Sequence, residues 1–103
     1  MTRVRRGHDK ERQCVRELTA RGYEAIRSAG SKKTWDVIAV GPYDVKLIQC
    51  KRMKWTKNPT PSALAPKAVM EQMRRAPAPK NTVVQKELWT WVDRKGWTVT
   101  IVL

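Results

Sequence analysis

Residues 35–52 read WDVIAVGPYDVKLIQCKR, and this stretch decides the fold of the chain. Trp35 to Val40 is an apolar run typical of a buried strand, and Gly41-Pro42 ends it. Tyr43 to Arg52 follows as another strand, in which side chains alternate between two faces. Because so short a connection joins the two strands, they are expected to pair as an antiparallel hairpin.

Polar side chains interrupt one face of the second of these strands. Gln49 and Lys51 lie two residues apart and therefore project from the same face, beside Leu47. Asp36 opens the preceding strand, and the hairpin register brings its carboxylate near both of them at one end of the sheet. An acid, an amide and an amine are therefore expected to converge there.

Outward from the hairpin, the patterns predict two helices and three further strands. One helix spans Asp9–Arg21, with Asp9 as its cap and Gly22 as its left-handed stop. The remaining elements are a strand at Tyr23–Ser28, a basic turn at Ala29–Lys33, a helix at Ser62–Arg75 with Pro66 in its first turn, and strands at Thr82–Val92 and Trp97–Leu103 joined by a turn at 93–96. The order αβββαββ indicates an α/β or α+β domain in which helices flank a mixed sheet.

The composition indicates one small basic domain, residues 1–103. The chain has 22 Lys and Arg against 9 Asp and Glu, a formal charge of +13 and a pI of about 10.5. A charge this high on a small body favours a nucleic-acid partner over a membrane surface or a merely soluble basic protein. With 41% apolar residues the chain can bury one core, which excludes a disordered tail and a multidomain enzyme.

Targeting signals and cysteine content point to an intracellular protein. No apolar run approaches the roughly 18 residues that cross a bilayer, and residues 1–12 lack the hydrophobic segment of a signal peptide. Cys14 and Cys50 are too few for a disulfide framework and too far apart for a CxxC metal site. Both are therefore expected to be reduced.

Glu11 adds a second carboxylate to the predicted polar cluster, because it shares the core-facing stripe of the first helix with Cys14 and Leu18. Such a cluster suits phosphodiester hydrolysis, since hard oxygen ligands hold magnesium and the metal lowers the pKa of a bound water. Each residue of the cluster also has a structural alternative, as a turn cap, a helix-terminal charge or part of an exposed strand face.

Several short motifs occur in a specific order in the first half of the chain. They are Glu11-Arg12, Arg21-Gly22-Tyr23, Arg27-Ser28-Ala29-Gly30-Ser31, Asp36 and Gln49-Cys50-Lys51. With these motifs the sequence resembles the archaeal-type Holliday junction resolvases, a branch of the PD-(D/E)xK nuclease superfamily. The Arg-Ser-Ala-Gly-Ser turn is more specific than the QxK motif by itself. The resemblance implies a restriction-endonuclease-like fold, and either a cellular or a viral origin suits it.

The resemblance also implies a role for each matched residue. The implied catalytic residues are Glu11, Asp36, Gln49 and Lys51, and the implied contacts to Mg²⁺, for which Mn²⁺ would substitute, are Glu11, Asp36, Gln49 and Cys50. Arg12 and Arg27 are implied to contact the scissile or an adjacent phosphate, and Ser28 and Ser31 to contact the DNA backbone in a loop that Lys32 and Lys33 extend. Gln49 departs from the glutamate that these resolvases usually carry: its amide oxygen can still coordinate a metal, but without formal charge.

A basic segment follows the QxK strand directly. Arg52, Lys54 and Trp55 are expected to contact DNA, with Trp55 either packing on a base or sugar or buried in the core. His8 is expected to cap the first helix or lie on the surface, with a contact to phosphate as the alternative.

Trp89 and Trp91 lie two residues apart and share one strand face. Large apolar groups occur on both faces of this strand, so a second copy of the chain is expected to cover the exposed pair and form a homodimer. The alternative is an unusually Trp-rich core. The resemblance also favours a dimer, because two active sites on a twofold axis would nick opposite strands of a junction.

The expected function is that of an intracellular, nucleoid-associated, homodimeric endonuclease that uses Mg²⁺ to cut four-way DNA junctions symmetrically; a virus-encoded copy would act in a host cell. Two alternatives stay open. One is a nuclease of the same fold acting on flaps or duplex DNA, since phosphate contacts position a protein without naming its substrate. The other is a non-catalytic basic nucleic-acid-binding module, which the neutral Gln49 favours and the retained Glu11, Asp36 and Lys51 oppose.

Overall fold

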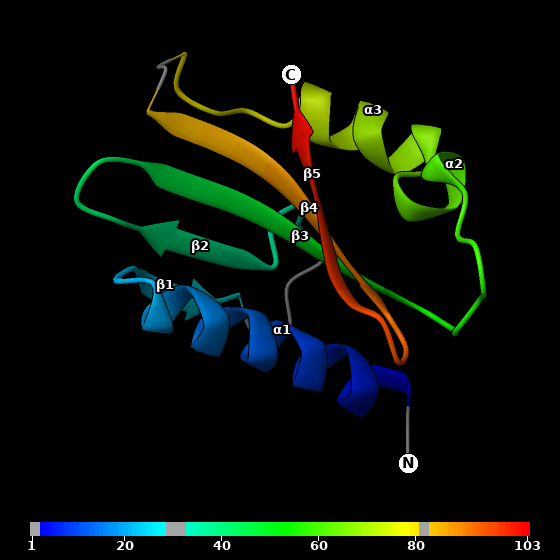
Figure 1. Ribbon diagram of the computed structural model, residues 1–103. Coiled ribbons are helices and arrows are strands. Elements are labelled where there is room, and N and C mark those ends of the chain that lie inside the picture. Colours follow the sequence, from blue (N-terminus) through cyan, green and yellow to red (C-terminus); the bar gives the residue numbers. More distant parts are fainter. Residues whose placement is uncertain (1–2, 29–32, 81–82) are drawn as a thin grey trace.

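The computed structural model describes residues 3–28, 33–80 and 83–103 of the chain, and side chains from residue 9 onward. The elements are α1 (Arg3–Ala20), β1 (Glu24–Arg27), β2 (Val37–Val40), β3 (Val45–Met53), α2 (Pro61–Leu64), α3 (Lys67–Arg75), β4 (Val84–Val92) and β5 (Gly96–Val102). The strands form one sheet in the order β1-β2-β3-β4-β5 (Figure 1). The pairs are antiparallel except for β3 and β4, which run parallel, so the expected mixed sheet is confirmed.

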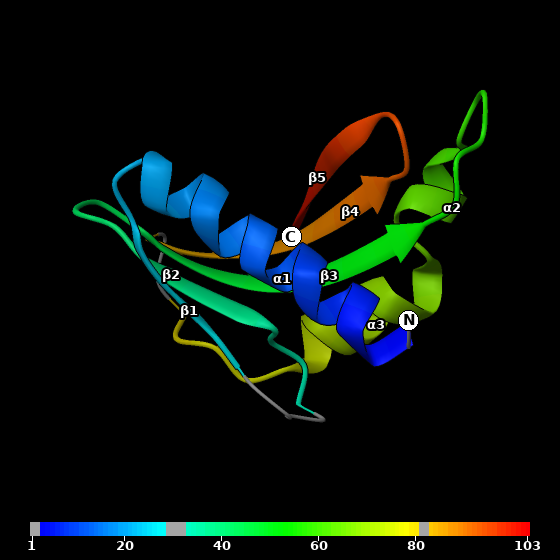
Figure 2. The ribbon, with the colours of Figure 1, turned by 90° about the horizontal axis from the view of Figure 1, so that it is seen from below.

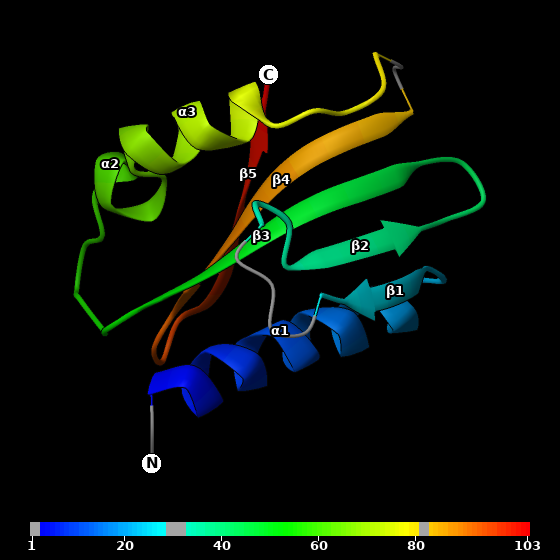
Figure 3. The same ribbon diagram turned by 180° about the vertical axis from the view of Figure 1, so that it is seen from behind.

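Helices cover the two faces of this sheet at different places (Figures 2 and 3). On one face, α1 packs across β1, β2 and β3, where Leu18 and Ile48 are fully buried with Trp89. On the other face, α3 packs near β5, where Met73 is buried with Leu88. Neighbouring residues of β4 therefore point into opposite cores, as strand alternation requires. Full burial of a side chain such as Leu18 contributes about 2 kcal/mol.

The first helix begins at Arg3, so the prediction that Asp9 caps it is wrong. The residues before Asp9 include several arginines and no proline, and they can extend the helix. The predicted stop at Gly22 is confirmed: its φ is +93°, and the backbone N–H groups of Gly22 and Tyr23 donate to carbonyls of the last helical turn.

The second predicted helix, Ser62–Arg75, is broken in two. Thr60 caps α2 through a hydrogen bond from the Ala63 backbone N–H to its hydroxyl oxygen, at 3.1 Å. Pro66 then stands at the start of α3 and does not lie within a first turn of one longer helix. A proline disfavours helical backbone angles at the residue before it, and Ala65 accordingly has φ −136° and ψ 76°.

The strands lie within the predicted segments or extend them by one residue, and the β4–β5 turn falls where it was expected. In this turn Arg94 adopts a left-handed φ of +69°, which is uncommon for a residue other than glycine. No helix in the described ranges has both the length and the apolar character needed to cross a membrane.

Candidate active site

The hairpin register places Asp36 at the point where β2 stops pairing with β3. Val37 lies opposite Ile48, and the Asp36 backbone N–H donates to the Ile48 carbonyl at 2.8 Å. At the next hydrogen-bonding position of β3, the Asp36 side chain replaces a backbone partner: its Oδ2 accepts the Cys50 backbone N–H at 2.8 Å. The carboxylate therefore lies against the edge of β3 at Cys50, the residue between Gln49 and Lys51.

Gln49 is the second polar residue at this point. Its Oε1 atom is buried and accepts no hydrogen bond from the described residues. Among all described side chains, the indole nitrogen of Trp97 is the other buried polar atom without a hydrogen-bond partner. An unpaired buried acceptor costs about 1–3 kcal/mol. A hard cation that accepts this lone pair would remove the cost, so the amide oxygen fits a metal ligand. Lys51 shares the face of Gln49 and is half-buried.

Burial raises the pKa of Asp36 from its ordinary 3.8 to about 6. The Cys50 N–H works in the opposite direction, and the nearby Glu11 carboxylate raises the pKa further. A half-buried carboxylate whose charge is disfavoured by burial and by a second carboxylate is typical of a site that receives a cation or a proton.

Glu11 faces the sheet from α1, as the helical stripe predicts. Its side chain is 16% exposed, and its Oε1 lies 3.3 Å from Arg27 Nη1 on β1, whose side chain is 19% exposed. This ion pair holds Arg27 at the edge of the candidate site and balances one of the two carboxylates.

Cys50 presents its backbone N–H to the Asp36 carboxylate, and its thiol packs in the core beneath α1. A hydrogen bond with Cys14 and burial raise the pKa of the Cys50 thiol strongly, so it stays protonated among these core residues. The Asp36 and Glu11 carboxylates also act to raise this pKa. A neutral thiol is a poor metal ligand. The two backbone groups of one strand residue point to the same edge, so the Cys50 carbonyl faces the Asp36 side together with its N–H.

The ligand chemistry of the site is unusual because one oxygen donor is an amide. Within the described residues, no group of three or more His, Cys, Asp or Glu side chains could hold a metal ion. The cluster offers two carboxylates, Glu11 and Asp36, and the uncharged Gln49. Mg²⁺ keeps several waters and needs only one or two carboxylates, so this donor set still fits it.

The predicted DNA-binding loop is only partly described, since Ser31 and Lys32 lie outside the described residues. The Ser28 backbone N–H donates to the Asp36 carbonyl at 2.8 Å, which ties the start of this loop to the site. Lys33 is exposed. Arg12 is also accessible: its side chain is 54% exposed and lies 3.5 Å from Asp9.

The basic residues at the end of β3 and just after it are on the surface. Arg52 makes two hydrogen bonds to Asp93, at 2.9 and 3.0 Å, and Lys54 is exposed. Trp55 is 48% exposed, so the alternative that it is buried in the core is wrong. The Arg94 guanidinium carbon lies 5.9 Å from the centre of its ring. The sequence reasoning missed Arg94 as a neighbour of Trp55, although two successive basic residues, Arg94 and Lys95, in a predicted turn are a recognisable signal.

The expectation that Trp89 and Trp91 form an exposed pair is wrong. The two residues do share a face, but α1 covers it: Trp89 is 1% exposed and packs edge-on against Trp97. Trp91 is half-buried, packs edge-on against Trp97 and carries the Lys10 ammonium 3.7 Å from its ring centre. The alternative of a Trp-rich core describes this region better.

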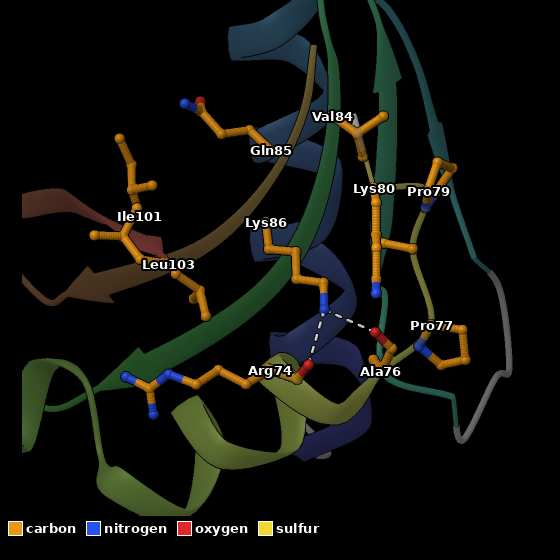
Figure 4. Close-up of a pocket in the computed structure, with 12 residues that line it drawn as sticks. Arg74, Ala76, Pro77, Pro79, Lys80, Val84, Gln85, Lys86, Ile101 and Leu103 are labelled. Carbon is orange, nitrogen blue, oxygen red and sulfur yellow. Dashed lines mark hydrogen bonds between the residues drawn. The ribbon is translucent and has the colours of Figure 1, made fainter. Parts of the chain in front are cut away.

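A cavity of about 650 Å³ lies elsewhere, between the start of β4, the end of β5 and the segment after α3 (Figure 4). Lys86 points into it and donates to the carbonyls of Met73, Arg74 and Ala76. Its ammonium therefore caps the C-terminal end of α3. None of the predicted catalytic residues lines this cavity.

The mixed sheet, with an Asp and a Gln-x-Lys pair where two strands separate, fits the nuclease fold expected from the sequence. The fold agrees with that of Hjc, a Holliday junction resolvase from the archaeal hyperthermophile Archaeoglobus fulgidus, with a TM-score of 0.65 and 22% sequence identity over 94% of this chain and 73% of that one. The family profile of the archaeal Holliday junction resolvases (Hjc) matches residues 2–59, more than half of the chain. The chain therefore belongs to this family of nucleases. No curated protein matches it.

Proposed function

We propose that this protein cuts four-way DNA junctions by metal-dependent, paired cleavage as a homodimer. The observation that carries the proposal is the buried, unpaired Oε1 of Gln49, next in sequence to Cys50, whose backbone N–H binds an Asp36 carboxylate with a pKa of about 6. A purely structural cluster would satisfy its own polar groups. The family match and the fold support junction DNA as the substrate.

Asp36, Gln49 and the Cys50 carbonyl would hold a divalent cation, with Glu11 contributing from α1. Mg²⁺ is the expected ion, and Mn²⁺ would substitute. When bound, such a cation offsets charge on the phosphate and lowers the pKa of a bound water. The neutral amide makes the site one charge poorer than a three-carboxylate site, which lowers its affinity for the cation.

The side chains around the cation site position the DNA. Lys51 would orient the attacking water, since it projects from the same face as Gln49. Arg27 would contact the scissile or an adjacent phosphate, and its ion pair with Glu11 orients its guanidinium beforehand. Arg12 and the loop from Ser28 to Lys33 would hold the neighbouring backbone.

The homodimer rests on the reaction, because two opposed cuts need two active sites. Its apolar centre cannot include the buried Trp89. The sheet leaves a different apolar row open: Ile26 is 62% exposed and Ile38, its partner across the β1–β2 ladder, is 38% exposed. A second copy covering this row would place the two active sites on one twofold axis.

The experiment that tests the function uses matched four-way, flap and linear DNA, incubated with the protein in Mg²⁺ or in EDTA. We expect paired nicks in the four-way DNA in Mg²⁺ and none in EDTA. Equal cutting of flap or linear DNA would favour a broader nuclease. Tight binding with no cutting in Mg²⁺ or Mn²⁺ would favour the non-catalytic module, the alternative that the neutral Gln49 supports.

A further inference from the structure

A second basic surface lies at the end of the sheet beyond the candidate active site. It combines the segment after β3 with the β4–β5 turn, two parts of the chain about 40 residues apart. We call it the Trp55 platform and define it by Lys54, Trp55, Lys57, Arg94 and Lys95. In Figure 2 the β4–β5 turn lies on the same side of the molecule as the segment that follows β3.

Backbone and side-chain contacts hold the platform together as one unit. The Asp93 backbone N–H donates to the Met53 carbonyl at 3.1 Å, and Lys95 Nζ donates to the Lys57 carbonyl at 2.8 Å. The turn itself is tight, because the Lys95 backbone N–H donates to the Val92 carbonyl at 2.9 Å. These bonds place charges from two separate segments on one surface.

The platform carries unbalanced positive charge. Asp93 is the carboxylate of the turn, and Arg52 occupies both of its oxygens. Among the described residues, Lys54, Lys57, Arg94 and Lys95 make no ion pair with an acidic side chain. Four such cations this close together repel one another unless a polyanion binds them.

Arg94 is oriented before any partner arrives. Its φ of +69° holds the backbone in a conformation that a free chain rarely adopts, and its guanidinium lies 5.9 Å from the centre of the Trp55 ring. A guanidinium that an aromatic ring holds in place loses less entropy when it pairs with a phosphate. Trp55 remains 48% exposed, so part of its ring can also contact a sugar.

We infer that the Trp55 platform binds the phosphate backbone of a duplex DNA arm outside the cleavage site, with Arg94 and Lys95 as its principal contacts. The inference rests on the proposed function, since it takes DNA as the partner. Met53 lies four residues beyond Gln49 along β3, which corresponds to about 13 Å. At about 3.4 Å per nucleotide along a DNA strand, the platform would contact the arm about four nucleotides from the cut.

The test measures junction binding in EDTA, so that it does not depend on cleavage. The variant Arg94→Asn/Lys95→Gln keeps a residue that tolerates positive φ at position 94. We expect its affinity to fall roughly tenfold and the slope of log affinity against log salt to become shallower by about 1.8. Arg75→Gln/Lys80→Gln removes the same charge from the α3 end of the molecule and should leave the slope within about 0.5. Equal effects of the two variants would overturn the inference.

Single neutral methylphosphonates placed along one arm then locate the contact. One position should weaken binding of the wild-type protein and have no effect on Arg94→Asn/Lys95→Gln. The absence of any such position would overturn the inference. Trp55→Leu should weaken binding severalfold at an unchanged salt slope, because the charges remain and only their orientation is lost; unchanged affinity would remove Trp55 from the platform. A wild-type protein that binds junctions without cutting them would count against the proposed function and leave this test intact.

Discussion

The two ends of β3 carry polar clusters that differ in how well they are satisfied. At the Val45 end, the Lys46 ammonium pairs with Glu87 and lies 3.4 Å from Asp44, and the Tyr23 hydroxyl donates to the same Asp44 at 2.7 Å. Burial works to lower the pKa of Lys46, but Glu87, Tyr23 and Asp44 together outweigh it and the pKa is raised. Each ionised group at this end has a partner of opposite charge.

At the Gln49 end, ten to fifteen ångströms along the same strand by the usual rise of about 3.3 Å per residue, the balance is reversed. The Asp36 carboxylate lies near another carboxylate, and the Gln49 oxygen has no partner. The polar groups of the first cluster satisfy one another and stabilise the fold. The unsatisfied groups of the second cluster lower the stability of the folded state. The difference identifies the Gln49 end as the one built for a ligand.

Removing the functional group of Asp36 or of Lys51 should have the largest effect, and that effect falls on the cleavage rate. Asp36→Asn or Lys51→Ala should lower the cleavage rate by about a thousandfold or more, since several kcal/mol of transition-state stabilisation depend on these groups. Junction binding should stay within a fewfold, because the affinity is spread over many Lys and Arg. Single-turnover cleavage and EDTA binding measure the two quantities, with Glu24→Gln on exposed β1 as the control. Substantial cleavage by both variants would place the chemistry elsewhere.

Breaking the satisfied cluster should act on stability and spare the chemistry. Glu87→Gln leaves Lys46 with a weaker partner in a place where the two side chains are 13% and 4% exposed. We expect the free energy of unfolding to fall by about 2–3 kcal/mol. Glu17→Gln breaks an exposed pair with Arg21 and should cost less than about 1 kcal/mol. Urea denaturation compares the two; equal losses would mean that the buried pair is no more important than the surface pair.

Charging the Gln49 end should change its metal requirement. Gln49→Glu restores the carboxylate usual in these resolvases and adds one negative charge beside the cation. The Mg²⁺ concentration for half-maximal cleavage should fall by about tenfold, which corresponds to roughly 1.4 kcal/mol. A Mg²⁺ titration of the cleavage rate measures it. If neither the midpoint nor the rate changed, Gln49 would not be a ligand.

The smallest expected effect is a gain of stability from Asp36→Asn without metal. The folded-state pKa of Asp36, about 6, exceeds its ordinary 3.8, so the folded state binds the proton more tightly. Ionisation of Asp36 therefore destabilises the wild-type fold as the pH rises from about 4 through 6. At pH 8 in EDTA the variant should be more stable by about 1 kcal/mol, a value reduced for the partial exposure of this group. Below pH 4 the difference should vanish; a thermal shift that does not depend on pH would mean that ionisation of Asp36 is not its cause.

The parts that could be predicted from sequence are those that local pattern controls. Alternation and a short Gly-Pro connection predict the β2–β3 hairpin, and with it the meeting of Asp36 and the Gln49 strand. The burial of Trp89 was not predictable in this way, because alternation gives the shared face of Trp89 and Trp91 but not the helix that covers it. The break at Pro66 shows the same limit, since the helical pattern continues across a residue that starts a helix but does not fit in the interior of one.

The parallel pairing of β3 with β4 has a consequence for the order of folding. The two strands pair over nine residues, from Val45↔Val84 to Met53↔Val92, although they are about 40 residues apart in sequence. Contacts between such distant segments form late, because the loop between them must close first. The hairpin that holds Asp36 is local and can form early, but the strand carrying Gln49 and Lys51 gains its second neighbour only when β4 docks. During refolding, nuclease competence should therefore appear with the last phase of sheet formation.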